Sequence, residues 1–145
     1  MAPGFSLPDD TGATVSLEDF KGKRVVLYFY PRADTPGCTT ESCEFRDAFP
    51  RFDGVDAVVL GASPDTVVAQ AKFRKKYDFP FRLLADADHA LAEQYGVWKE
   101  KSMYGRRYMG VERTTFVIGP DGRVTHVFAK VKPAGHAEQV LSALA

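Results

Sequence analysis

Two cysteines, Cys38 and Cys43, are the residues of this sequence best suited to chemistry. They are the only cysteines among 145 residues, which is too few for a disulfide scaffold. In a reducing compartment such a pair is reactive or metal-binding more often than structural. Cys38 follows residues 31–37, which lead from an apolar run into a sequence with helical periodicity. Backbone N–H groups and the dipole at a helix start favour an anion, so the sequence predicts a stabilised thiolate at Cys38.

Helical spacing places the two cysteines on different faces of the expected helix. Cys38, Phe45 and Phe52 follow one another at seven-residue steps, which drift by only about 20° per step, so Cys38 is expected to face inward. Cys43 lies about 140° further round the helix axis. The two Cα atoms are then on the order of 8.5 Å apart, beyond the roughly 7 Å that a disulfide spans. A disulfide between these cysteines therefore requires the helix to unwind in part.

Two other interpretations of the cysteine pair are weaker. A zinc site is not favoured, because there is no second cysteine pair and His89, His126 and His136 are scattered along the chain. Ordinary cysteines without a chemical role stay an alternative, since free cysteine is among the most frequently buried residue types.

The elements that must position Cys38 are a strand and a helix. Residues 25–30 are apolar, β-branched and aromatic, which predicts a strand buried on both faces at the centre of a sheet. Residues 36–52 have helical periodicity, with Thr35 as the N-cap. We expect Pro50 to interrupt this helix or to end its regular part. Residues 55–62 predict a second strand, parallel to the first because the connection is long.

The remaining pattern predicts an α/β sandwich. Ser63 is expected to cap a second helix whose basic residues Lys72, Arg74, Lys75 and Lys76 are mostly solvated. A strand at 81–84, a helix at 88–95, a strand pair at 114–118 and 124–128, a helix at 134–144 and a small N-terminal hairpin formed by 5–7 and 14–16 complete the chain. This order predicts one domain over residues 1–145 with a thioredoxin-like fold, in which helices flank a central mixed β-sheet.

Composition narrows the range of partners. Nineteen basic residues balance nineteen acidic ones, so no uniform field attracts nucleic acid or an acidic membrane. No apolar stretch approaches the roughly 20 residues that span a bilayer, and the first residues have no leader pattern. We therefore expect a cytoplasmic protein that binds neither nucleic acid nor a membrane.

Three segments of the sequence resemble the peroxiredoxins, and within them the bacterioferritin-comigratory or Q-type subgroup. The resemblance is carried by FSLPDDTGATVSLEDFKGKRVVLYFYP, FYPRADTPGCTTESCEFRD and GVWKEKSMYGRRYMGVERTTFVI, and it covers essentially the whole chain. The family motif P-x-x-x-T-x-x-C corresponds here to Pro31, Thr35 and Cys38.

The resemblance implies a role for each matched residue. Cys38 is the peroxidatic cysteine, whose backbone N–H binds the peroxide together with the hydroxyl of Thr35. Pro31 shields the thiolate. Arg113 completes the site, and Glu41 orients that arginine. Without the family resemblance, Arg113 would be interpreted as a surface residue of a strand, and Glu41 as a glutamate favoured by the dipole at a helix start.

The resemblance also implies a catalytic cycle. Cys43 is the resolving cysteine, which forms an intramolecular disulfide with Cys38 that thioredoxin or a similar dithiol donor reduces. The implied substrates are hydrogen peroxide and organic hydroperoxides, the implied role is antioxidant defence, and the implied state is a monomer that needs no metal or organic cofactor.

Two alternatives use the same cysteine pair. A thiol-disulfide oxidoreductase is disfavoured, because there is no C-x-x-C and residues 110–115 contain no proline. A redox sensor that does not turn over stays open, since its oxidation chemistry is the same and only the fate of the disulfide differs.

Overall fold

The computed structural model describes residues 2–144. Its elements in chain order are β1 (Ser6–Pro8), β2 (Thr14–Ser16), a 3₁₀ helix (Leu17–Phe20), β3 (Arg24–Phe29), α1 (Pro36–Gly54), β4 (Ala57–Ser63), α2 (Val67–Tyr77), β5 (Arg82–Ala85), α3 (Ala90–Gln94), β6 (Trp98–Met103), β7 (Arg106–Val111), β8 (Thr114–Ile118), β9 (Val124–Phe128) and α4 (His136–Leu144). The predicted alternation of strands and helices is confirmed, and β6 and β7 are additional.

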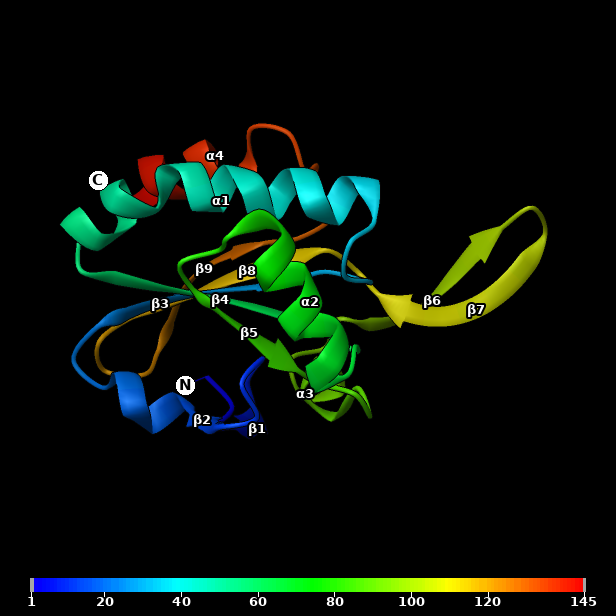
Figure 1. Cartoon of the computed structure of the whole chain (residues 1–145), viewed down its shortest axis with the longest axis horizontal. Helices are drawn as coiled ribbons and strands as arrows, with labels where there is room; N and C mark the ends of the chain where they lie inside the picture. Colours follow the sequence, from blue (N-terminus) through cyan, green and yellow to red (C-terminus); the bar gives the residue numbers. More distant parts are fainter. Residues whose placement is uncertain (1, 145) are drawn as a thin grey trace.

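A five-stranded mixed sheet forms the centre of the molecule, in the order β5-β4-β3-β8-β9 (Figure 1). The strands β3, β4 and β5 are parallel, whereas β8 is antiparallel to both β3 and β9. The prediction that β3 is central and buried on both faces is confirmed. Val26 and Tyr28 belong to one hydrophobic cluster, and Val25, Leu27 and Phe29 belong to the other.

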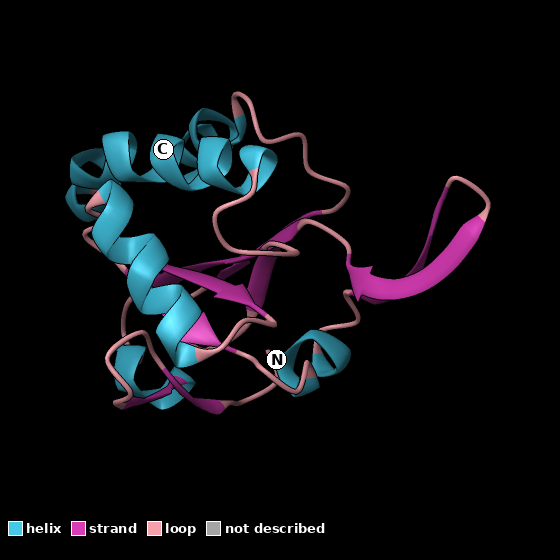
Figure 2. Ribbon diagram, turned by 45° about the vertical axis from the view of Figure 1, so that its right-hand side comes forward, coloured by secondary structure: helices cyan, strands magenta, loops and turns pink. Residues whose placement is uncertain are grey.

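Helices cover the sheet as predicted. The helices α1 and α4 lie side by side over one face of the sheet (Figures 1 and 2). The helix α2 adds Phe73 to the hydrophobic cluster that contains Val26 and Tyr28. The short helix α3 contributes Leu91 and Ala92 to the cluster on the opposite face. Within residues 2–144, no helix combines the length and apolar character needed to cross a bilayer.

Two predicted helix features are wrong. The helix α1 continues through Pro50 to Gly54 instead of ending its regular part at the proline, and packing of its buried face against the core is the physical reason. The helix α2 begins at Val67 with Thr66 as its N-cap, whose side chain accepts a hydrogen bond from the N–H of Ala69. Ser63 instead ends β4, and its hydroxyl donates to Asp65 at 2.6 Å.

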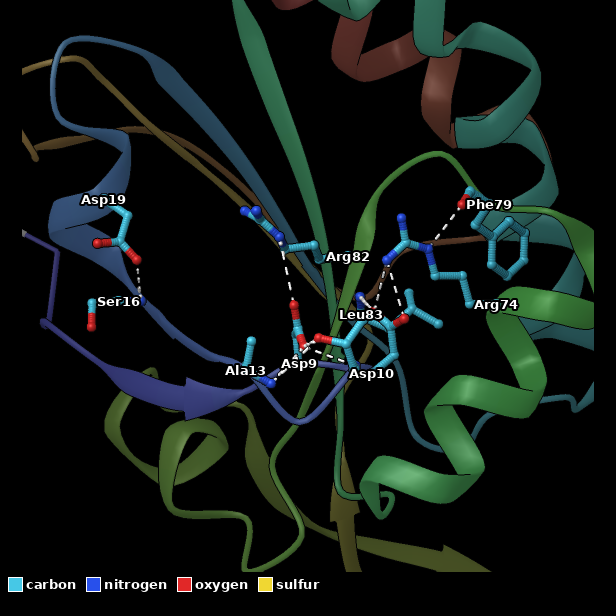
Figure 3. A network of polar contacts seen from close by, with 10 residues as sticks. Asp9, Asp10, Ala13, Ser16, Asp19, Arg74, Phe79, Arg82 and Leu83 are labelled. Atoms are coloured by element: carbon cyan, nitrogen blue, oxygen red, sulfur yellow. Dashed lines mark hydrogen bonds and ion pairs between the residues drawn. The ribbon is translucent and has the colours of Figure 1, made fainter.

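The basic residues of α2 are less uniformly solvated than predicted. Arg74 is half-buried, and its guanidinium forms an ion pair of 3.1 Å with Asp10 and donates to the carbonyl of Phe79 at 3.0 Å (Figure 3). Lys76 is exposed, but it forms an ion pair of 2.9 Å with Asp34. These carboxylates come from distant parts of the chain, so helical spacing alone does not reveal the pairs.

The predicted N-terminal hairpin forms from β1 and β2, and two buried carboxylates in its turn attach it to β5. Asp10 accepts from the N–H of Leu83 at 3.1 Å, and Asp9 lies 3.6 Å from the guanidinium of Arg82 (Figure 3). Burial opposes ionisation of Asp9, but hydrogen bonds from Thr11 and Ala13 and the charge of Arg82 outweigh it and lower the pKa of Asp9. The acidic turn therefore fixes the hairpin against the sheet.

The hairpin formed by β6 and β7 is not predicted by the sequence analysis. It projects beyond the body of the molecule, where both views show it clear of the sheet (Figures 1 and 2). Its tip is exposed, with Tyr104 99% accessible. No helix within residues 2–144 covers the projecting part of this hairpin (Figures 1 and 2), and its strands therefore lack the apolar alternation by which half-buried strands are recognised. Only Glu112 and Arg113 separate the end of β7 from the start of β8, so the hairpin leads directly to Arg113.

Candidate active site

Cys38 occupies the first turn of α1, at the point where the chain enters the helix from the end of β3. Thr35 is the N-cap in an extended conformation, with Pro36 as the first helical residue. The first backbone hydrogen bond of the helix runs from the N–H of Thr39 to the carbonyl of Thr35 at 2.8 Å. The N–H groups of Gly37 and Cys38 precede it and are available to an anion.

The thiol of Cys38 points into the molecule, as helical spacing predicts. Its residue is 0% exposed and belongs to the hydrophobic cluster that contains Phe45 and Phe52. The phenolic group of Tyr28, stacked on Phe45, bonds to the hydroxyl of Ser42 at 2.9 Å within the same cluster. The sulfur atom is therefore buried in largely apolar surroundings.

Arg113 brings the only hydrogen bond to the sulfur found among the described residues. Its Nη2 donates to Cys38 Sγ at 3.2 Å, and its Nη1 donates to Glu41 Oε1 at 2.8 Å. Burial works against the guanidinium charge, but the charges of Glu41 and Cys38 outweigh burial and raise the pKa of Arg113. Arg113 is thus a fixed cation beside the thiol, 75 residues further along the chain.

Glu41 orients Arg113 from one turn further along α1. The carboxyl is 0% exposed, and burial raises its pKa to about 7 even though the charge and hydrogen bond of Arg113 lower it. Its second oxygen, Oε2, is buried and has no hydrogen-bond partner among residues 2–144. The Glu41 carboxyl can therefore bind a proton near neutral pH.

Thr35 and Pro31 lie in the loop that precedes α1. The hydroxyl of Thr35 donates to the carbonyl of Arg32 at 2.8 Å, so its only proton is engaged within the loop and its oxygen is left to accept. Pro31 is half-buried at the start of the loop. Neither side chain has a hydrogen bond to Cys38, so the structure directly joins only Cys38, Glu41 and Arg113 of the predicted residues.

Residues outside the predicted site hold this loop in place. The N–H of Ala33 donates to Asp65 at 2.8 Å, and Asp34 binds both Lys76 and the hydroxyl of Tyr77. The hydrogen bond and charge of Lys76 lower the pKa of Asp34. These positioning residues are not recognisable from the sequence, because their partners are remote along the chain.

Gly37 is a further residue of the site that is not predicted from the sequence. A Cβ atom at this position would lie 3.2 Å from Nη2 of Arg113 and 3.4 Å from Cγ of Pro133. The absence of a side chain at Gly37 therefore lets the guanidinium approach the helix start.

Cys43 lies on another face of α1, as predicted, and both cysteines are free thiols. Cys43 is half-buried and packs against the same cluster. Burial raises the pKa of its thiol, and Asp47 adds to this while Arg46 opposes it. Since α1 is helical at both cysteines, they cannot join while the helix is intact.

The described part of the chain contains no group of three or more His, Cys, Asp or Glu side chains placed to hold a metal ion. A cysteine at a helix start, with an arginine donating to its sulfur, has the electropositive surroundings that are typical of thiol-based redox proteins. The chain matches the model of the AhpC/TSA family over residues 1–127. It belongs to that family, and within it to the peroxiredoxins of the bacterioferritin-comigratory type that the resemblance indicated.

Named relatives support this assignment over nearly the whole chain. The chain is 49% identical to peroxiredoxin Bcp of Bacillus subtilis, over 99% of this chain and 91% of that protein. It is 45% identical to peroxiredoxin Bcp of Escherichia coli, over 98% and 91% respectively.

Solved structures agree with the fold. The structure of Xanthomonas campestris peroxiredoxin Q has 44% sequence identity and a TM-score of 0.92, covering 97% of this chain and 89% of that one. Another structure, with 43% identity, the same TM-score and the same coverage, concerns alkyl peroxide reduction by the X. campestris bacterioferritin comigratory protein. The predicted thioredoxin-like fold is confirmed by this likeness.

Proposed function

We propose that this protein is a thiol peroxidase that reduces hydrogen peroxide and organic hydroperoxides in antioxidant defence. The observation that carries the proposal is the contact between Arg113 and the sulfur of Cys38 at the first turn of α1. Relatives named peroxiredoxin, and the alkyl peroxide reduction studied in X. campestris, support the same activity.

In the first step the thiolate of Cys38 attacks one peroxide oxygen. The O–O bond breaks, Cys38 becomes a sulfenic acid, and the other oxygen leaves as an alkoxide or hydroxide that takes up a proton. The N–H of Cys38 and the guanidinium of Arg113 stabilise the charge as it moves between the oxygens. The Thr35 oxygen accepts a hydrogen bond from the O–H of the peroxide, while its own hydroxyl donates to the carbonyl of Arg32. Pro31 shields the thiolate from solvent.

In the second step the thiol of Cys43 attacks the sulfenic acid, which forms a Cys38–Cys43 disulfide and releases water. Helix geometry requires the first turns of α1 to unwind before this reaction. Some of the hydrogen bonds that hold this part of α1 must break when it unwinds. They join Glu41 to Arg113, Ser42 to Tyr28, and Glu44 to the N–H of Gly135.

Thioredoxin or a similar dithiol protein then reduces the disulfide, returning both thiols and leaving with a disulfide of its own. The proposed cycle takes place in the cytoplasm, in a monomer, without a metal or organic cofactor. Support for these finer points is the family assignment and the proximity of the two cysteines in sequence.

The test compares the wild type with Cys38→Ser and Cys43→Ser in the presence of hydrogen peroxide, thioredoxin, thioredoxin reductase and NADPH. We expect no peroxide consumption by Cys38→Ser, and one oxidation event followed by poor turnover for Cys43→Ser. Peptide mapping of the oxidised wild type should find the Cys38–Cys43 disulfide. A disulfide without turnover by any dithiol donor would indicate a redox sensor, and no disulfide would exclude Cys43 as the resolving residue.

A further inference from the structure

The segment between β9 and α4 lies against the first turn of α1 and against the active-site arginine. This segment, residues 129–135, is called the strap below (Figure 1). The N–H of Val131 donates to the carbonyl of Arg113 at 2.9 Å. A Cβ atom added to Gly37 would lie 3.4 Å from Cγ of Pro133 and 3.2 Å from Nη2 of Arg113. The strap therefore contacts both the residue that binds the sulfur and the helix turn that carries it.

Glu44 fastens the strap to α1. Its Oε1 accepts a hydrogen bond from the N–H of Gly135 at 2.8 Å. The carbonyl of Gly135 accepts from the N–H of Gln139 at the start of α4, and the dipole at a helix start favours the negative charge of Glu44. Glu44 directly follows Cys43 in the chain. This hydrogen bond therefore holds the part of α1 that must move before the two cysteines can meet.

Two features make the position of the strap depend on these contacts. Lys130 has a left-handed backbone with a φ of 51°, which a residue other than glycine keeps only when the surrounding structure holds it there. The strap also lines a cavity of about 720 Å³, together with Phe128, His136 and Gln139, so there is open space beside it. The strap can therefore shift when its hydrogen bond to Glu44 breaks.

We propose that Glu44 is a positioning residue whose hydrogen bond to Gly135 keeps α1 closed and thereby decides between two fates of oxidised Cys38. In one, Cys43 attacks the sulfenic acid, and a disulfide and water form. In the other, a second peroxide oxidises the sulfenic acid to a sulfinic acid and is itself reduced to water or an alcohol. Only the first requires an open helix, so a contact that favours the closed helix also favours over-oxidation. This inference rests on the function proposed above, because it concerns the regulation of the same site.

The first experiment does not depend on peroxidase activity. Amide hydrogen exchange of the reduced protein is followed by NMR in the wild type, Glu44→Ala and Glu44→Gln. Losing one hydrogen bond, worth about 1 kcal/mol, should raise the population of the open helix about fivefold. The amides of Ser42 and Cys43 should then exchange about fivefold faster in Glu44→Ala. Glu44→Gln should stay within twofold of the wild type, because its amide oxygen still accepts from Gly135.

The pair of substitutions separates the hydrogen bond from the charge. Both remove the negative charge of Glu44, which also acts on the pKa of Glu41. Only Glu44→Ala removes the acceptor as well. A difference between the two variants therefore reports on the hydrogen bond to the strap.

The second experiment measures the two fates of Cys38. Quenched-flow peptide mapping after one equivalent of hydrogen peroxide gives the rate of disulfide formation. Mass spectrometry of protein that cycles with thioredoxin at rising peroxide concentration gives the sulfinic acid fraction. Glu44→Ala should form the disulfide about fivefold faster and need about fivefold more peroxide for the same sulfinic acid fraction. The rate of the first oxidation should change by less than twofold.

Glu138→Ala is the matched control. Glu138 of α4 forms an ion pair of 2.7 Å with Arg51 of α1, a contact between the same two helices that lies beyond Pro50 and away from the turns that carry the cysteines. It should change either measurement by less than twofold. Unchanged rates in Glu44→Ala, or equal changes in Glu44→Gln or Glu138→Ala, would overturn the assignment. A wild type that forms no disulfide would refute the proposed role of Cys43, while hydrogen exchange would still decide whether Glu44 keeps α1 closed.

Discussion

Replacing Arg113 with methionine tests how the site lowers the barrier for peroxide reduction. The substitution keeps an unbranched apolar stem and removes the hydrogen bond of 3.2 Å to Cys38 Sγ. Loss of one donor that stabilises transition-state charge reduces a rate by about 10²–10³. We therefore expect the rate constant for Cys38 oxidation by hydrogen peroxide to fall by about two to three orders of magnitude. Arg113→Lys should give an intermediate rate, since lysine keeps the charge but not the fork that reaches both Cys38 and Glu41.

The same substitution affects stability through Glu41. Removing one partner of a buried ion pair costs about 3–5 kcal/mol when the other charge stays in place. The pKa of Glu41 is already about 7 with Arg113 present, so without the guanidinium the carboxyl becomes protonated and the loss is smaller at pH 6 than at pH 8. The double variant Arg113→Met/Glu41→Gln removes the uncompensated acid and should recover much of the lost stability.

Stopped-flow oxidation and urea unfolding separate these two effects. The double variant should regain unfolding free energy but stay as slow as Arg113→Met, because the donor to the sulfur is still missing. A rate for Arg113→Met within tenfold of the wild type would refute the argument that Arg113 stabilises the transition state. Recovery of the rate in the double variant would show instead that the charge of Glu41 is what slows Arg113→Met.

Three further predictions concern the same helix. Gly37→Ala should slow Cys38 oxidation about tenfold, because its Cβ would lie 3.2 Å from Arg113 Nη2; urea unfolding should show unchanged or slightly higher stability, since alanine suits a helix better than glycine. Ser42→Ala should speed disulfide formation after oxidation about fivefold in quenched-flow mapping, because losing its bond to Tyr28 destabilises the closed helix by about 1 kcal/mol. The pKa of Glu41 is raised from 4.5 to about 7 in the folded protein, so its contribution to the free energy of unfolding is complete below pH 4.5 and is lost as the pH rises through 7. In urea titrations over that pH range, the free energy of unfolding of the wild type should fall by about 3 kcal/mol more than that of Glu41→Gln.

Local patterns in the sequence are sufficient to predict the scaffold around Cys38. The apolar run that forms β3 and the helical spacing of Cys38 with Phe45 correctly give a central strand and an inward-facing thiol. These features depend on backbone periodicity and on burial, both of which are local properties of the chain. Most residues of β7 are exposed and only Val111 at its end is buried, so this strand has too little apolar alternation to be predicted.

Contacts between distant segments account for what the sequence leaves undetermined. Only the family resemblance predicts a role for Arg113, because nothing in the neighbouring sequence indicates that its side chain reaches a residue 75 positions earlier. The side chain of Lys101 lies beside Gly110 because of the register of the β6–β7 hairpin, which pairs strands across a turn. The ion pair of Asp34 with Lys76 likewise depends on the way α2 packs beside the loop.

The contact that prepares Cys38 for attack also connects oxidation to helix opening. Arg113 binds the sulfur with one nitrogen and Glu41 with the other, so it fastens the first turns of α1 to the segment before β8. A thiolate and a guanidinium carry opposite charges, so the hydrogen bond between them is stronger than the bond that the same guanidinium donates to a neutral group. In the proposed cycle, oxidation replaces that thiolate with a neutral sulfenic acid and weakens this attachment. The closed helix is thus most stable when Cys38 is ready to react, and it becomes easier to unwind once Cys43 is needed.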